Sequence, residues 1–167
     1  MHGYKDPEIS KINYAAVMGE VLSLVLPSYQ GQKVRLSYQA PDELYLTIDP
    51  EKLKLALVNL VHNSLEASLP LNETDPSGEV LIEQEQEERK NGIITRVRIY
   101  QTGILPSAYA TKLNSGVQFS TKGEKGNGKG ASGSFNYIKK VHGGGLRYVP
   151  NERVKKEGYH GLIEITL

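Results

Sequence analysis

The stretch NLVHNSLEAS, residues 59–68, combines two amide side chains with a carboxylate at helical spacing. At about 100° per residue, Asn59, Asn63 and Glu66 fall along one edge of an apolar stripe. The stripe consists of Leu53, Ala56, Leu57, Leu60, Val61, Ser64 and Ala67. Polar side chains at this border could form a binding wall, or they could be ordinary boundary residues hydrogen-bonded to a loop. The stretch alone leaves both interpretations open.

A second stretch, KGEKGNGKGASGSF at residues 122–135, is rich in glycine and lysine. It does not fit the P-loop, because Gly130 follows Lys129 where a magnesium-binding serine or threonine is required. A dinucleotide-binding motif fails because no strand precedes it. What remains is G-x-G-x-G at Gly126, Gly128 and Gly130, directly before an expected helix. The unpaired amides and positive dipole end of a helix start favour a phosphate there.

The charge of the surrounding segment agrees with an anionic ligand. Residues 101–130 contain four lysines, one glutamate and no aspartate, which gives a local charge of +3. Such a segment can attract a polyphosphate. A solvated flexible loop with a glycine hinge explains the same composition equally well. The glycine-rich stretch alone therefore leaves both interpretations open.

Apolar periodicity and turn residues predict the elements that would position these two stretches. The expected elements are, in chain order, a helix over 10–26, strands over 33–39 and 43–48, a helix over 50–67, strands over 79–86 and 92–100, a long loop over 101–130, a helix from 131, and strands over 145–149 and 161–167. Asp49 as N-cap and Pro50 in the first turn support the second helix. The long loop is typical of a lid or binding loop.

This order predicts an α+β fold, a two-layer sandwich with three helices on one face of a mixed, mostly antiparallel sheet. We expect residues 1–9 to be a linker or junction and residues 10–167 to form one domain, because 167 residues suit a single core. With 20 lysines and arginines against 19 acids, the net charge of +1 indicates neither nucleic acid nor a membrane surface as a partner. The absence of cysteine excludes disulfides and thiolate metal sites. No apolar run reaches about 18 residues, so we expect a domain without membrane contact. The absence of cysteine is compatible with the cytoplasm, and the expected location is cytoplasmic, either as such or as the cytoplasmic part of a membrane sensor.

Taken together, the motifs resemble the ATP-binding domain of sensor histidine kinases, in the superfamily that also contains gyrase and MutL. The resemblance rests on N-x-x-x-N on a helix, a long lid, the FSTK of Phe119–Lys122, G-x-G-x-G, and a last helix ending in VHGGGLRYV. It extends over nearly the whole chain. It implies the Bergerat-type ATP-binding fold, ATP and Mg²⁺ as cofactors, and transfer of the γ-phosphoryl group to a histidine.

The resemblance also implies roles for individual residues. Asn63 matches the asparagine that coordinates Mg²⁺ between the phosphates, and Asn59 lies one turn away beside them. His62 stands where related sequences often have a basic residue, although an exposed helix histidine explains it equally well. Asn59 and His62 are therefore the candidate catalytic residues. The other implied nucleotide contacts are Gln101, Gly103, Thr121, Lys122, Gly126, Gly128, Lys129, Gly130 and Ala131.

Two of the family's glycine boxes depart from their usual pattern. The first, D-x-G-x-G, reads Gln101-Thr102-Gly103-Ile104-Leu105. Because Thr95, Val97, Ile99 and Gln101 share one phase of a strand, Gln101 points where the family's aspartate would accept a hydrogen bond from adenine. A glutamine oxygen can accept the same bond without negative charge, and Leu105 fills space beside the base. In the second box, Lys129 and Ala131 replace leucines.

These departures keep a second hypothesis open, in which a degenerate, non-catalytic member serves as a regulatory protein-interaction module. A related serine kinase of the anti-sigma-factor type is less favoured, because that group has an acid where Asn59 stands. None of the four histidines lies in a long heptad helix. We therefore expect the partner to be a dimerisation and phosphoacceptor helical hairpin, in the same parent chain or a separate protein, with a response regulator downstream.

Overall fold

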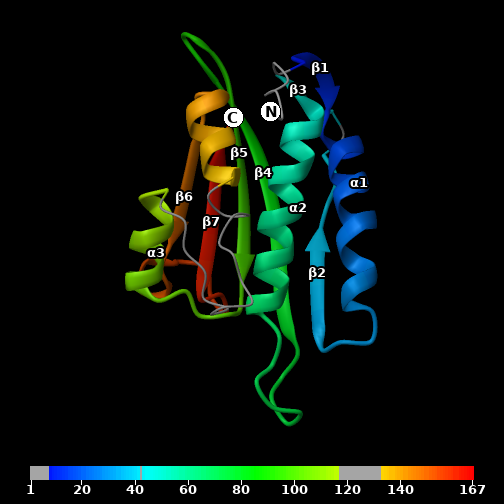
Figure 1. Cartoon of the computed structure of the whole chain (residues 1–167), viewed down its shortest axis with the longest axis vertical. Coiled ribbons are helices and arrows are strands. Elements are labelled where there is room, and N and C mark those ends of the chain that lie inside the picture. The colour runs from blue at the N-terminus through cyan, green and yellow to red at the C-terminus, as the bar shows by residue number, and fades with distance from the viewer. Residues whose placement is uncertain (1–7, 42, 117–132) are drawn as a thin grey trace, which may run out of the picture.

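The computed structural model describes residues 8–41, 43–116 and 133–167, with helices packed on one face of a twisted sheet (Figure 1). The sheet has five strands in the order β2-β4-β5-β7-β6, and only the β2–β4 pair is parallel. The strands are β2 Val34–Tyr38, β4 Gly78–Arg89, β5 Gly92–Gln101, β6 Gly145–Val149 and β7 Gly161–Thr166. The predicted α+β sandwich with a mixed, mostly antiparallel sheet is confirmed.

The first predicted helix begins later than expected. Residues Ser10–Asn13 form strand β1, and helix α1 spans Tyr14–Val25, followed by a 3₁₀ turn, η1, at Leu26–Tyr29. The side chain of Asn13 caps α1 by accepting a hydrogen bond from the Ala15 amide at 2.9 Å. The prediction of a helix from residue 10 is therefore wrong, because this cap ends the extended segment.

The predicted strand over 43–48 exists as β3, Tyr45–Ile48, but it does not join the main sheet. It pairs antiparallel with β1 in a separate two-stranded sheet. In the main sheet, the strand beside β4 on that side is β2.

Helix α2, Pro50–Ala67, agrees with the prediction at both ends. Asp49 caps it, since its Oδ1 accepts a hydrogen bond from the Lys52 amide at 3.0 Å. The predicted stripe is buried except at Ala67, which is exposed because the helix ends there. The buried members of the stripe are Leu53, Ala56, Leu57, Leu60, Val61 and Ser64.

Strands β4 and β5 form a long hairpin whose pairing continues from Val80 opposite Gln101 to Arg89 opposite Gly92. The turn is therefore shorter than predicted, because charged residues from Glu87 to Arg89 remain within the ladder. As the strand phase predicts, Thr95, Val97, Ile99 and Gln101 are buried.

A helix interrupts the predicted loop over 101–130. This helix, α3, spans Ser107–Asn114 and buries only Ala110, so apolar spacing gave no signal for it. It is held instead by tertiary hydrogen bonds. The Asn114 side chain donates to the Tyr148 carbonyl at 2.8 Å and accepts from the Tyr148 amide at 2.7 Å, which ties α3 to β6.

The last helix is described from Gly133 and continues as a π-helix, η3, over Asn136–Val141. In this segment the His142 amide donates to the Tyr137 carbonyl, five residues earlier, at 2.9 Å. Ile138 is fully buried, and Gly143 follows the helix with a φ of +79°. A short 3₁₀ turn, η4, at Asn151–Arg153 connects β6 to β7.

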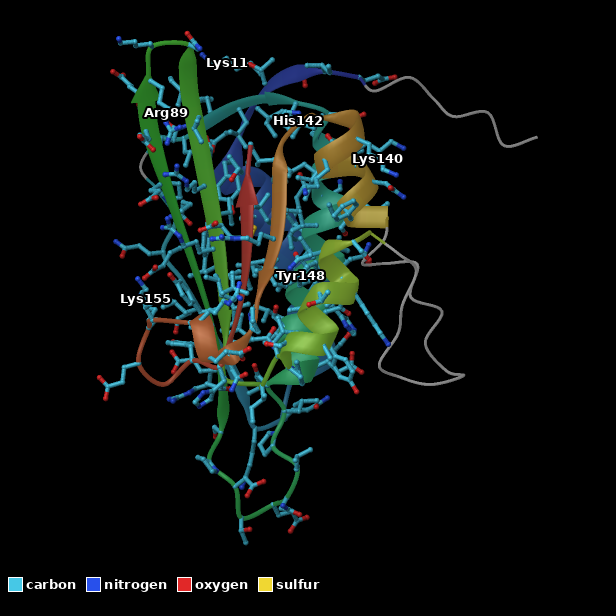
Figure 2. All side chains as sticks on the ribbon, turned by 90° about the vertical axis from the view of Figure 1, so that its left-hand side faces the viewer. Lys11, Arg89, Lys140, His142, Tyr148 and Lys155 are labelled. Carbon is cyan, nitrogen blue, oxygen red and sulfur yellow. The ribbon has the colours of Figure 1, made fainter. Side chains whose placement is uncertain are left out.

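Seen from the side, the helices α2, α3 and η3 lie on one face of the sheet, and the opposite face carries its own dense layer of side chains (Figure 2). Within the described ranges, no helix combines the length and the apolar character that crossing a membrane requires.

Candidate functional site

Two asparagines on α2 form the first part of the candidate site. Asn59 and Asn63 are half-buried and one helical turn apart. Among the described residues, neither side-chain amide has a hydrogen-bond partner. Each amide can donate two hydrogen bonds and accept two, and partly buried polar groups are normally paired. Both side chains therefore have unused capacity for a polar ligand.

The end of β5 forms the second part, and Gly103 brings it against the end of α2. A Cβ atom at Gly103 would lie 2.0 Å from the Ala67 carbonyl oxygen, so only glycine fits this approach. The Gly103 amide points to the Ser68 hydroxyl oxygen at 3.4 Å. Because Ala67 lies one turn beyond Asn63, this contact places the end of β5 close to the asparagine pair.

Gln101 occupies the inward position that the strand phase predicts, and 5% of it is exposed. Its Nε2 donates a hydrogen bond to the Gly103 carbonyl at 3.2 Å. Gly161 on the neighbouring strand packs so closely that a Cβ there would lie 2.8 Å from Gln101 Cγ. The side chain is therefore held in one orientation, with its amide nitrogen committed to the backbone.

His62 lies next to Asn63 in the chain on α2 and is engaged by neighbouring side chains. The ring of Tyr29 meets it edge-on at 5.5 Å, and the Tyr29 hydroxyl donates to the His62 carbonyl at 3.0 Å. Nδ1 of His62 lies 3.8 Å from Oε2 of Glu66. Burial, together with the charge of Glu66, raises the pKa of Tyr29 to about 12, so this phenol stays a neutral donor. The sequence pattern gave no sign of Tyr29.

The last helix packs along the first half of α2. The Tyr137 hydroxyl donates to the Asp49 carbonyl at 3.2 Å, and the Ser134 hydroxyl approaches the Ala56 carbonyl at 3.4 Å. Burial is the main cause that raises the pKa of Tyr137 to about 12. Tyr137 was not singled out from sequence, because a tyrosine on a buried helix face reads as core.

The structure thus places Asn59 and Asn63 in the second half of α2, with His62 next to Asn63 in the chain, and Gln101 and Gly103 at the end of β5, which meets the end of that helix at Ala67. The remaining predicted contacts lie outside the described residues; these are Thr121, Lys122, Gly126, Gly128, Lys129, Gly130 and Ala131.

Neither a scan against protein-family models nor a search of curated proteins finds a match. Solved structures, in contrast, match over nearly the whole chain. The catalytic domain of histidine kinase ThkA, in a nucleotide-free form, superposes with a TM-score of 0.74 at 20% identity, covering 96% of this chain and 95% of that one. The mycobacterial sensor histidine kinase MprB gives a TM-score of 0.74 at 18% identity, with coverage of 95% and 96%.

A third match is to ThkA in complex with the response regulator TrrA, with a TM-score of 0.70 at 20% identity. There the match covers 95% of this chain and 41% of the kinase chain. At this level of identity, what the likeness establishes is the architecture. The protein has the fold of histidine kinase catalytic domains.

Proposed function

We propose that this protein is the ATP- and Mg²⁺-binding catalytic domain of a sensor histidine kinase. It would donate the γ-phosphoryl group to a histidine on a separate helical hairpin, in the same parent chain or another protein. The observation that carries the proposal is the pair Asn59 and Asn63, half-buried and without hydrogen-bond partners among the described residues. The close approach of Gly103 to Ala67, one turn beyond Asn63, supports it.

The residues present fit a metal-bound nucleotide. Magnesium prefers oxygen ligands and is commonly bound by few protein groups together with substrate phosphates. The neutral amide oxygen of Asn63 suits this role, because the phosphates bring the negative charge. When bound, Mg-ATP supplies the phosphoryl group to be transferred.

The chain's own residues would position the nucleotide, since phosphoryl transfer depends on positioning and charge stabilisation. Asn59 would hold the phosphate side of the site, one turn before Asn63. His62 would add a donor next to it, braced by Tyr29 and Glu66. Gln101 and Gly103 would border the base. The contacts from Thr121 to Ala131 remain predictions that rest on the resemblance.

A second candidate function is a regulatory protein-interaction module that does not catalyse transfer. It is favoured by one observation at the end of β5, where Gln101 is neutral and its amide nitrogen is already bonded to the Gly103 carbonyl. A neutral amide at this position forms a weaker hydrogen bond with a nucleobase donor than a carboxylate would.

The partners and location follow from the proposed kinase role. ThkA has been crystallised with a response regulator, and we propose a response regulator as the downstream partner of this protein as well. The acceptor hairpin is its immediate partner. Both of these partners imply that the protein acts in the cytoplasm.

Isothermal titration with ATP and Mg²⁺ tests the proposal directly. We expect binding to the wild-type protein at millimolar nucleotide or below. Asn63→Ala should weaken Mg-ATP binding by about tenfold or more, and the difference should shrink when Mg²⁺ is omitted. Asn91→Ala, in the exposed β4–β5 turn, is the matched control and should bind as the wild type does.

No binding heat at millimolar ATP with Mg²⁺ would remove the kinase proposal and leave the regulatory module. Equal affinities of the Asn63→Ala and Asn91→Ala variants would remove the assigned role of Asn63. Circular dichroism of each variant confirms that the fold is kept.

A further inference from the structure

Asp49 joins three segments of the chain at one buried point. The residue is 6% exposed, and each carboxylate oxygen accepts a different backbone amide. Oδ1 accepts from Lys52 at the start of α2, and Oδ2 accepts from Glu8 in the entering chain, both at 3.0 Å. Its carbonyl accepts the hydroxyl of Tyr137 at 3.2 Å.

One of the three segments carries residues of the candidate site, and the other two are fixed to its start. The helix that Asp49 caps carries Asn59 and Asn63. Tyr137 belongs to η3, which packs beside that helix. Glu8 immediately precedes Ile9 and strand β1, where the chain enters the domain. Figure 1 shows β1, the start of α2 and η3 gathered at the same end of the molecule.

We propose that Asp49 is a positioning residue that fixes η3 and the entering chain relative to the asparagine pair on α2. The inference rests on the proposed nucleotide-binding function and adds a route by which movement of the preceding segment reaches the site. Displacement of Glu8 would release Oδ2, weaken the cap of α2, and shift the carbonyl that holds Tyr137.

The chemistry of Asp49 suits this task better than that of an ordinary cap. A serine at an N-cap satisfies one amide, as Asp49 Oδ1 does, but it has no second oxygen for another backbone donor. A buried carboxylate with two amide partners is costly to leave half-bonded, so its bonds from Lys52 and Glu8 are expected to change together. The carbonyl of Asp49 accepts the Leu53 amide at 3.0 Å as well as the Tyr137 hydroxyl, so a change in the cap also reaches Tyr137 through the first turn of α2. The bond from the Tyr137 hydroxyl and the two amide bonds to the carboxylate are therefore expected to respond together.

The link to η3 is tested with Tyr137→Phe, which removes only the hydroxyl. The matched control is Tyr14→Phe, because Tyr14 is fully buried and its hydroxyl has no partner within the described part of the chain. We expect Tyr137→Phe to raise the Kd for Mg-ATP by about threefold to tenfold at a temperature where the protein is fully folded. Amide hydrogen exchange over residues 133–141 should speed up without nucleotide. Tyr14→Phe should change neither.

The link to the entering chain is tested with Glu8→Pro, which removes the backbone donor, against Glu8→Ala, which keeps it. Glu8→Pro should speed exchange over 133–141 and raise the Kd, whereas Glu8→Ala should leave both at the wild-type values. In an Asp49→Ser background, which keeps the helix cap and lacks the second oxygen, Glu8→Pro should have no further effect.

The outcomes separate this inference from the proposed function. If the wild type does not bind Mg-ATP, the proposed function fails, and the exchange data alone decide whether Asp49 couples the segments. If the wild type binds and Tyr137→Phe matches Tyr14→Phe in both readouts, the positioning role is wrong while the proposed function stands. A lowered melting temperature with unchanged Kd and unchanged exchange would also overturn it, since that is the result of a purely structural contact.

Discussion

At the residue scale, Gln101 determines what the end of β5 could offer to a base in the proposed site. Its amide nitrogen is bonded to the Gly103 carbonyl, and its stem is packed against Gly161. The side chain is uncharged, and hydrogen bonds to charged groups are worth about 1.5–3 kcal/mol against about 1 kcal/mol for neutral ones. The absence of charge at this position is therefore expected to weaken recognition of a donor such as an exocyclic amino group.

Replacing Gln101 by aspartate should change the stability of the protein and its affinity for ATP in opposite directions. Without ligand, Gln101→Asp loses the donor to Gly103 and buries a charge near a carbonyl, so the free energy of unfolding should fall by about 1–3 kcal/mol. With ATP, the new carboxylate can accept from the adenine amino group, and the affinity should rise about tenfold. Urea unfolding and isothermal titration measure the two effects.

Gln101→Asn is the matched control, because it has the same shape as the aspartate without the charge. Equal ATP affinity of the two variants would show that the charge is not used and would favour the regulatory module. The orientation of Gln101 was predictable from the strand phase. Its hydrogen bond to Gly103 was not predictable, because it depends on the packing of Gly161, which lies on the neighbouring strand β7 but is distant in the sequence.

At the element scale, the contact between the ends of α2 and β5 depends on Gly103 having no side chain. Gly103→Ala would place a Cβ 2.0 Å from the Ala67 carbonyl oxygen, and backbone must move to relieve it. We expect this variant to lose about 2–4 kcal/mol of unfolding free energy and to bind nucleotide more weakly. Denaturant unfolding and titration with Mg-ATP check both.

A glycine in open space provides the control. Gly19 lies inside α1, and nothing is within 4 Å of the position that its Cβ would occupy. Gly19→Ala should raise the unfolding free energy by about 0.5–1 kcal/mol, because alanine is the better helix former. If both variants destabilised the protein equally, the close approach at Gly103 would not be the cause.

The elements that sequence reasoning missed share one physical property. Helix α2 was predictable because its apolar spacing, its cap and its first-turn proline agree. Helix α3 has one buried residue and is held by bonds from Asn114 to β6, and β1 is held by pairing with β3. Local pattern cannot reveal elements whose stability comes from distant partners.

At the scale of the whole molecule, the open face of the sheet carries a network of ion pairs across four strands. Arg98 Nη2 lies 2.8 Å from Glu85, and its Nε lies 3.2 Å from Glu164. Glu164 also pairs with Arg147 at 2.8 Å. The network links β4, β5, β7 and β6 on the face away from the helices. Which charges meet on this face depends on the register of the strands, which the sequence pattern does not give.

This network should make stability sensitive to acid. The hydrogen bond from Arg98 is the main cause that lowers the pKa of Glu85 below its ordinary value of 4.5. The folded state therefore binds this proton more weakly than the unfolded state, so the contribution is present above about pH 4.5 and is lost as the pH falls through the folded pKa. Because Glu85 is largely exposed, the contribution is about 0–1 kcal/mol.

Urea unfolding at pH 7 and pH 3 tests this expectation. Glu85→Gln should be slightly less stable than the wild type at pH 7, and the difference should vanish at pH 3. Glu88→Gln is the control, because Glu88 forms no ion pair within the described ranges. A difference between Glu85→Gln and the wild type that is as large at pH 3 as at pH 7 would contradict the assignment.

The Asn114 side chain has a consequence beyond fixing α3. Strand β6 is the last strand on its side of the sheet, and Asn114 occupies both the amide and the carbonyl of Tyr148 there. Unsatisfied edges are the places where foreign strands attach and fibrils grow. At Tyr148 this edge is already saturated by the protein itself, so self-association by strand addition is blocked at that point.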